Sequence, residues 1–591
     1  MRTVVPLTLL AALLPACPAL IGSGSGTEGE SGDGTTANTS DEPKKDLPDP
    51  TTGFQLECFP GEVRCSASDT QVLEVCAPTG LGWISFPCTE NEKCIEDVEA
   101  GTASCIGPCE MITNPNSVGC EFIAIKMASD NADEQPDALV VGNTDPSRTA
   151  EIQLHFTPKN SLTEAPLGDP ILLGPGESHV FLLTEESFNF YSNFRNGGVY
   201  RLKSDIPLTA YLHSTFVNDA SNDASMLLPT PTLRKDYIIA SYPGWVDALN
   251  PDNIGGRPSY FNVIALEDDT HVEWVAPWDT AAQGALVPHV PAGETGAITL
   301  NRFDVLQVGA SSLADNNFVK HDLSGTIVRA DKPIWVMGAT RCAYVPHDVK
   351  FCNHLQELMI PLEYWGKKYI GPHSPARADE KHYWRVYAGK DNVFVTIESN
   401  NPKVAPPPQN LAKQGDFIEL AVDHGTDLIF TANGPILPVQ YLTGGTAAAP
   451  GGDQTKRVGD PAMYQMVPFE QWQKRYVFVT GANYALNYVH VIRRADAADV
   501  TINGEVVTGY RFLSGKGTPS DPNRWEIADV PLGPSPNPLD PNNPDDLTTY
   551  VVESADEFNI VVVGYTVGAM TSAYAFPGGM NLKPINPDLG R

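Results

Sequence analysis

Outside its N-terminus, the sequence has no run of residues apolar enough to span a membrane. Its N-terminal run, Val4–Leu14, is interrupted by Pro6 and Thr8 and is shorter than the about 20 apolar residues of a spanning helix. It follows the positive charge of Arg2 and has the length of a signal-peptide core. The sequence therefore predicts export without a transmembrane helix.

Basic residues are also scarce. The chain of 591 residues holds 39 Lys and Arg against 72 Asp and Glu, with a formal net charge of −33. A protein that binds nucleic acid needs a basic face, so we expect no nucleic-acid partner. The acidic residues are spread along the chain, where they keep the surface soluble.

Common catalytic signatures are missing. The sequence has no Gly-x-Ser-x-Gly elbow, His-Glu-x-x-His helix or phosphate-binding Gly-Lys-Ser/Thr loop. Paired carboxylates for glycoside hydrolysis depend on spacing in three dimensions and stay open. The isolated histidines lie in strand-like runs and are interpreted as sheet-face residues: His155, His213, His271 and His490. We predict no catalytic residue, metal or cofactor, and hence no enzyme.

Long helical periodicity is absent as well. Short β-branched or aromatic runs recur instead, such as Tyr237–Ile239 and Tyr476–Val479. Gly, Pro, Asn and Asp separate them at about 8–12 residues, which is typical of sandwiches or barrels. The predicted fold class is all-β, with tandem repeated β-sandwich-like units, about four by the length of the repeat, after a small disulfide-rich module.

The apolar run closes on Leu14-Pro15-Ala16-Cys17. This resembles the lipobox of bacterial lipoprotein signal peptides, from which Pro15 departs. The resemblance implies a signal peptide over 1–16 and lipidation of Cys17, where several acyl chains give stable anchoring. The alternative is ordinary cleavage near Ala16 or Ala19. The absence of Asp directly after Cys17 favours the outer membrane or cell surface, by analogy with lipoprotein sorting.

Residues 17–53 contain little besides Ser, Gly, Thr, Asp, Glu and Pro. Such a segment buries too little apolar surface to offset the entropy of ordering, so it is predicted to be a disordered tether. Residues 54–110 follow as a cysteine-rich module, which is too short and polar to fold without crosslinks.

Ten cysteines remain beyond Cys17, and an even number in an exported chain predicts disulfides. Their connectivity in the N-terminal part stays open. The eight there are Cys58, Cys65, Cys76, Cys88, Cys94, Cys105, Cys109 and Cys120.

The other two, Cys342 and Cys352, are predicted to staple a loop. Zinc is the alternative, because His347 and His354 are close in sequence and two Cys with two His make a tetrahedral set. The acidic run 539–546 is interpreted as a solvated turn, with Ca²⁺ as its alternative.

Residues 111–591 repeat internally. One block reads Asp205-Ile206-Pro207-Leu208, then Asp331–Ile334 and Asn433–Ile436, with Asp556–Asn559 as a fourth copy that has Phe558 in place of the proline. In a second block a proline is followed eight residues later by Tyr237, Tyr369 and Tyr476. We interpret these residues as structural and predict units near 120–237, 238–369, 370–476 and 477–591.

The block Asp460-Pro461-Ala462-Met463, with Met466–Pro468 and Trp472–Tyr476, is similar to the N-terminal domain of the IgG Fc-binding protein, as is the repeated Asp/Asn-x-Pro-Ile strand. That domain also occurs in bacterial surface lipoproteins behind a lipobox and a cysteine-rich segment. The resemblance implies an extracellular, non-catalytic binding or adhesion module. It does not imply that IgG is the ligand.

Together these features predict a lipid-anchored surface protein that binds an unknown extracellular protein or glycan. The only expected contact with a membrane is through the anchor. The alternative is an exported hydrolase acting on polysaccharide or peptide. Its support is the predicted compartment and the abundance of acidic and aromatic residues.

Overall fold

The structure, a computed structural model, describes residues 57–589 apart from 90, 98–99, 131–134, 186–191, 217–220, 246–256, 312–320, 405, 514–523 and 537–546. Within this part the regular elements are strands and short 3-10 helices, so the all-β prediction is confirmed. No helix among these residues has the length and apolarity needed to cross a membrane.

The cysteine-rich module consists of two small antiparallel sheets held by disulfides. Strands β1 (Val63–Cys65), β2 (Val72–Cys76) and β3 (Trp83–Pro87) form one sheet, and β4 (Lys93–Asp97) pairs with β5 (Thr102–Ile106). The bonds are Cys58–Cys76, Cys65–Cys94, Cys88–Cys105 and Cys109–Cys120. Disulfide bonding in this region is confirmed, and the structure supplies the connectivity.

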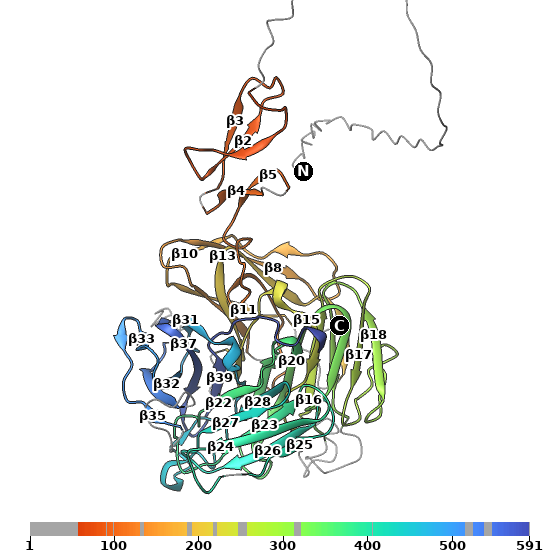
Figure 1. Cartoon of the computed structure of the whole chain (residues 1–591). Helices are drawn as coiled ribbons and strands as arrows, with labels where there is room; N and C mark the ends of the chain where they lie inside the picture. The colour runs from red at the N-terminus through yellow and green to blue at the C-terminus, as the bar shows by residue number, and fades with distance from the viewer. Residues whose placement is uncertain are drawn as a thin grey trace, which may run out of the picture. The chain divides into compact units, whose positions relative to one another are not determined.

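The remaining chain forms four units with the same strand plan, which we call units 1 to 4. Each has seven strands in common, and one long strand is shared between two antiparallel sheets. The first, third and fourth strands pair around the N-terminal half of the long strand. The second, fifth and last strands pair around its C-terminal half. Figure 1 shows the units following one another around a common centre, from orange through green to blue.

Each strand has an equivalent in the other units, named in order from unit 1 to unit 4. The first strands are β6 (Gly119–Ala124), β15 (Arg234–Ile238), β22 (Lys368–Gly371) and β31 (Gln473–Val479). The second are β7 (Asp137–Asn143), β16 (Ser259–Ala265), β23 (His382–Ala388) and β32 (Leu486–Arg494). The third are β8 (Ala150–Thr157), β17 (Thr270–Val275), β24 (Val393–Ser399) and β33 (Thr501–Ile502).

The fourth are β10 (Ile171–Leu173), β18 (Thr295–Leu300), β25 (Gln409–Leu411) and β34 (Glu505–Val506), and the fifth are β11 (Ser178–Leu183), β19 (Asp304–Gly309), β26 (Phe417–Val422) and β36 (Trp525–Gly533). The long strands are β13 (Val199–Ser214), β20 (Ile327–Ala343), β27 (Leu428–Ala432) continued as β28 (Ile436–Tyr441), and β37 (Thr549–Tyr565). The last are β14 (Asp223–Met226), β21 (Asn353–Leu358), β30 (Met463–Gln465) and β39 (Ala573–Pro577).

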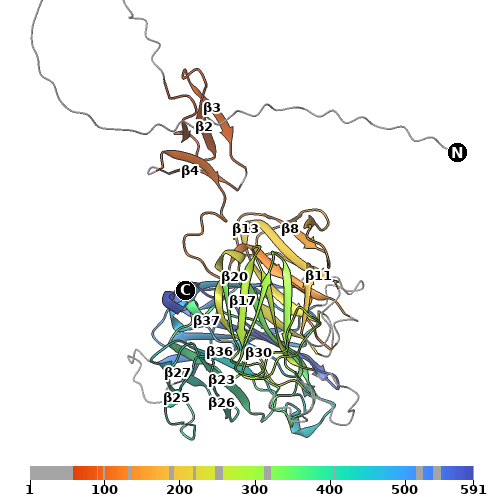
Figure 2. The same ribbon diagram turned by 90° about the vertical axis from the view of Figure 1, so that its right-hand side faces the viewer.

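Shorter elements complete the units. Extra strands are β9 (Ala165–Pro166), β12 (Asn193–Asn196), β29 (Arg457–Val458), β35 (Arg511–Phe512) and β38 (Val567–Gly568). The 3-10 helices are η1 (Thr230–Thr232), η3 (Leu362–Tyr364), η4 (Pro450–Gly452), η5 (Phe469–Gln471) and η6 (Pro587–Leu589). In the view turned by 90°, β17 and β20 of unit 2 face the viewer (Figure 2).

In units 1 and 2 the Asp-x-Pro-Ile block lies at a bulge inside the long strand, whereas in unit 3 it lies between β27 and β28, which begins at Ile436. In unit 2, Arg329 pairs with Asp236 and Ile334 pairs with Arg234. Between these two pairs β20 advances by five residues and β15 by only two, so β20 carries three extra residues. The same excess of three residues occurs in units 1 and 4. Proline fits there because a bulge leaves its missing N–H unneeded.

The bulge also corrects the alignment of the fourth copy. Phe558 pairs with Gln473 as Ile334 pairs with Arg234. Phe558 therefore occupies the place of the isoleucine, and Glu557 occupies the place of the proline.

The repeated tyrosines lock this bulge. Tyr369 lies in the first strand of unit 3, and its hydroxyl donates to the Ile436 carbonyl at 2.6 Å while accepting the Gly366 N–H at 2.9 Å. Tyr237 and Tyr476 make the equivalent pairs of bonds in units 2 and 4. In unit 1 the residue of equivalent register is Phe122, which pairs with Leu202.

The four last strands close a ring. Strand β14 contacts β21 and β39, and β30 contacts the same two strands. The two ends of the repeat region seal the join between units 1 and 4: Ser117 N–H donates to the Met580 carbonyl at 2.9 Å, and Leu582 N–H donates to the Pro115 carbonyl at 2.9 Å. Beyond this join, Asn586 Nδ2 donates to the Trp365 carbonyl at 2.6 Å.

Candidate functional site: one loop face of the ring

Four equivalent loops meet at one end of the ring axis. Each joins the long strand of a unit to its last strand, and together they comprise residues 215–222, 344–352, 442–462 and 566–572. Because they enter neighbouring strands of the closed ring in equivalent positions, they surround the same end of the axis. We call this surface the loop face.

The loops of the loop face are bonded to one another. Strand β29 in the third loop pairs with β38 in the fourth. The Gly444 N–H donates to the Val345 carbonyl of the second loop at 2.8 Å. The Arg457 guanidinium lies 3.6 Å from the ring centre of Phe351. The described parts of this face are therefore a connected surface on a rigid scaffold, which is where binding residues commonly lie.

The second loop carries the Cys342–Cys352 disulfide. Because the two sulfurs are bonded to each other, neither is a thiolate ligand for the zinc alternative. The two histidines also separate: His347 is exposed, whereas His354 is buried on β21 with Nε2 3.3 Å from Gln356 Oε1. The Asp130 carboxyl lies beside the sulfurs, and it accepts a hydrogen bond from Arg341 Nε at 2.7 Å.

Exposed side chains on the loop face include two large apolar groups. Met570 is 59 % exposed and Val567 is 48 % exposed, both in the fourth loop. His347, Asp348 and Lys350 are exposed on the second loop. Apolar groups rimmed by polar ones are a common composition for protein contact surfaces.

Directly behind the loops, two buried side chains connect the units. Asn353 Nδ2, in unit 2, donates to the Asn222 carbonyl of unit 1 at 2.6 Å and to the Pro461 carbonyl of unit 3 at 2.7 Å, and it lies 3.3 Å from the Ala573 carbonyl of unit 4.

Asp223 does the converse from unit 1. Its carboxylate accepts the N–H groups of Gln356 and Met463 at 3.2 Å each, and also that of Ala575. One side chain therefore contacts the last strands of all the other units.

A second buried acid lies next along the axis. Glu357 Oε2 accepts from Ser225 Oγ at 3.2 Å and from Gln465 Nε2 at 3.1 Å. Burial raises the pKa of Glu357 well above its usual range, and the nearby Asp223 raises it further. Burial also raises the pKa of Asp223, although its backbone donors oppose that shift. Buried side chains at this level of the axis thus link the strands that carry the loop face.

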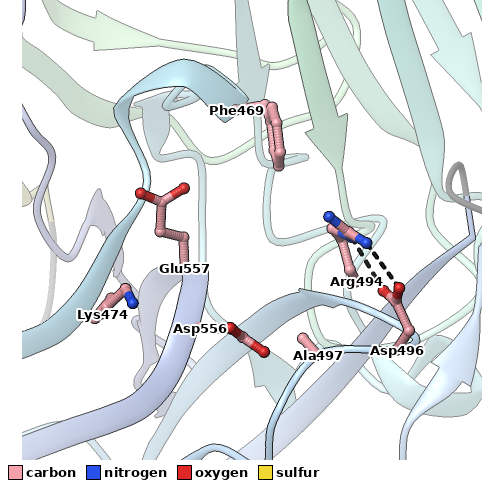
Figure 3. A pocket seen from close by; sticks show the side chains of 7 residues that line it. All are labelled: Phe469, Lys474, Arg494, Asp496, Ala497, Asp556 and Glu557. Carbon is pink, nitrogen blue, oxygen red and sulfur yellow. Dashed lines mark hydrogen bonds and ion pairs between the residues drawn. The ribbon is translucent and has the colours of Figure 1, made fainter.

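A separate charged pocket lies at the bulge of unit 4, outside the four loops of the loop face (Figure 3). It has a volume of about 350 Å³. Lys474 Nζ donates to the Ala555 carbonyl at 2.7 Å, and Arg494 Nη2 lies 2.7 Å from Asp496 Oδ2. Figure 3 shows Glu557 on the rim of the same hollow. Arg494 and Asp496 are paired with each other. We rank this pocket below the loop face, which is formed by loops from all four units.

Several predicted features lie outside the described residues. They are Cys17, the signal peptide 1–16, the tether 17–53 and the acidic run 539–546. The isolated histidines His155, His213, His271 and His490 are described, and they lie on strands β8, β13, β17 and β32.

The sequence did not reveal the importance of Asp223 and Asn353. Each lies at the first position of a last strand, and the signal available was a polar residue shortly before the Leu-Leu-Pro or Met-Ile-Pro block. Nothing local in the sequence shows that these strands meet at an axis.

The chain is thus a closed ring of β repeats with a cross-bonded loop face. The IgGFc binding protein family matches residues 223–564, which is more than half of the chain, and the chain belongs to this family. The match begins at the axis residue Asp223 and ends on β37 in unit 4.

Two individual proteins are similar to lesser degrees. The IgGFc-binding protein of Homo sapiens is 26 % identical over 231 residues, which are 38 % of this chain and 4 % of the human protein. The chain therefore matches a small part of that relative. A mutant of the major pilin from Streptococcus pyogenes covers 58 % of this chain and 98 % of its own, at 7 % identity and a TM-score of 0.11. This likeness has no bearing on the fold.

Proposed function

We propose that this chain is a lipid-anchored surface protein that binds an extracellular protein or glycan through the loop face. The observation that carries the proposal is the convergence of four equivalent loops, joined by β29–β38 pairing and by the Asn353 amide. A rigid surface of this kind loses little conformational entropy on binding, which favours affinity.

The proposal includes anchoring at Cys17, supported by the lipobox-like Leu14–Cys17 and the polar segment that follows. In this proposal the chain is attached to the membrane only through Cys17. Mass spectrometry of the membrane fraction tests it, since the N-terminal peptide should be acylated at Cys17. An unmodified N-terminus after Ala16 or Ala19 would contradict the anchor and leave the binding proposal intact.

Family membership supports a binding role, and the named ligand of the human relative makes IgG Fc one protein to include. A glycan and mucin array together with an IgG Fc panel identifies the partner. We expect Met570→Asp, on the loop face, to weaken binding about tenfold or more, as for a central contact residue.

The matched control is Leu172→Asp on β10, which changes another exposed apolar residue, 69 % exposed, in the same way. We expect it to leave binding unchanged. Equal losses from both variants would contradict the assignment to the loop face. A fluorogenic hydrolase panel tests the alternative function, because turnover abolished by a single Asp or Glu change would replace binding with catalysis.

A further inference from the structure

Three histidines of unit 3 come together beside the boundary with unit 4. His373 follows β22, His382 begins β23, and His424 lies in the turn between β26 and β27. Their ring centres are 5.8 Å apart for His373 and His382, 5.6 Å for His373 and His424, and 6.3 Å for His382 and His424. The three rings therefore form a compact triangle drawn from three separate segments.

His382 is the unusual member of this triangle. It is 1 % exposed, and neither of its ring nitrogens has a hydrogen-bond partner among the described residues. A buried donor or acceptor left unsatisfied costs about 1–3 kcal/mol. Such a group in a folded protein calls for a partner such as a water or an ion.

The neighbouring imidazole is already oriented. His373 Nδ1 lies 2.8 Å from the Ser374 carbonyl, so Nδ1 carries the proton and Nε2 has the lone pair. A hydrogen bond from one ring nitrogen to a carbonyl is the usual support for a histidine that binds metal through the other.

The charges around the triangle have both signs. Asp427 Oδ1 lies 4.0 Å from His373 Nε2, and Asp423 is exposed next to His424. Arg377 lies within electrostatic range of His382 and Arg511 within that of His373, but each is paired with an acid, Glu380 and Asp427 respectively. The positive charges that would oppose a cation are thus largely compensated.

We propose that His373, His382 and His424 form a binding site for a borderline transition-metal ion, with Zn²⁺ as the representative. Zinc bonds to imidazole nitrogen at about 2.0–2.1 Å, which places the ring centres of a tetrahedral site about 5 Å apart. The observed triangle is slightly wider than that. Because all three separations exceed that value, closing the site requires His373 and His382 to move toward each other as well as rotation of the exposed His424 side chain. The fourth position stays available to water.

Calorimetric titration of the full mature chain with Zn²⁺ tests this site. The expected result is one ion per chain, with affinity falling at least tenfold in His424→Ala. Because His424 is exposed, this variant keeps the fold even where His382→Ala does not. The matched control is His271→Ala, an exposed histidine on β17, which should bind as the parent does.

Two results would overturn the proposal. One is that the parent chain binds no zinc when the Zn²⁺ concentration is about 100-fold above a dissociation constant of about 1 μM. The other is unchanged binding in His424→Ala, which would place the ion elsewhere, for example at Cys17. Binding of a partner at the loop face is measured separately, so failure here leaves the proposed function standing.

Discussion

The three tyrosines that bond to the bulge of the long strand, Tyr237, Tyr369 and Tyr476, allow the same substitution by phenylalanine to be tested in three units. Tyr369→Phe removes the acceptor of the Gly366 N–H and a donor to the Ile436 carbonyl, both in the buried join between two strands. An N–H deprived of its partner in such a place costs about 1–3 kcal/mol. We therefore expect Tyr369→Phe to lower the free energy of unfolding by about 2 kcal/mol.

Tyr237→Phe and Tyr476→Phe should cost similar amounts, because their hydroxyls make equivalent bonds. The three sites share no partner, so the losses should add in a triple variant. Urea unfolding at a constant slope measures each change.

The control is Tyr488→Phe, since Tyr488 is half-buried and its hydroxyl makes no hydrogen bond to the described residues. We expect a change of about 0.5 kcal/mol or less there, as for an ordinary surface substitution. Changes this small at all three lock positions would refute the reasoning, and so would a control as damaging as Tyr369→Phe.

Three further changes test the axis, the loop face and the boundary between units. Glu357→Gln should have a higher free energy of unfolding than the parent chain, and the gain should grow as pH rises above 4.5, by up to about 1.4 kcal/mol per pH unit. The reason is that the raised pKa makes ionisation of Glu357 costly in the folded state. A difference between the two chains that does not change with pH would contradict this. Replacing Cys342 and Cys352 by Ser opens a loop with a sequence separation of 10 and should cost about 3 kcal/mol in thermal unfolding; an unchanged midpoint counts against a staple. Arg511→Ala should lower the free energy of urea unfolding by about 3 kcal/mol, because Asp427 is fully buried and accepts a hydrogen bond from Arg511 at 2.9 Å. If Arg511→Lys were nearly as stable as the parent chain, the paired geometry of the guanidinium would be unimportant.

The local features of the fold were predictable from sequence because they repeat. The eight-residue offset from proline to Tyr369 reflects a fixed distance from the 3-10 helix to the bulge lock, so chain geometry preserves it in every unit that has the tyrosine. The fourth copy of the block has no proline, so the sequence alone places Phe558 at the proline position, one residue away from its true equivalent. The pairing of Phe558 with Gln473 shows the correct register.

Long-range features were not predictable in the same way. The disulfide pairs of the module and the contacts of Asp223 depend on which strands meet after folding. The three histidines at 373, 382 and 424 come from three separate segments, with sequence separations of 9 and 42 residues between successive members, and no motif in the sequence shows that they meet. Ring closure likewise depends on the contact between β14 and β39, which lie in the first and last units of the repeat region.

The seal between units 1 and 4 has a consequence for how the protein is made. Ser117 Oγ accepts the Met580 N–H at 3.0 Å across a sequence separation of 463 residues. Contacts of such long range form late and slow folding, and sheets with unpaired edges are prone to aggregate in the meantime. A chain of this design therefore exposes unpaired strand edges until its last strand forms and closes the ring, and it needs protection from aggregation during that time.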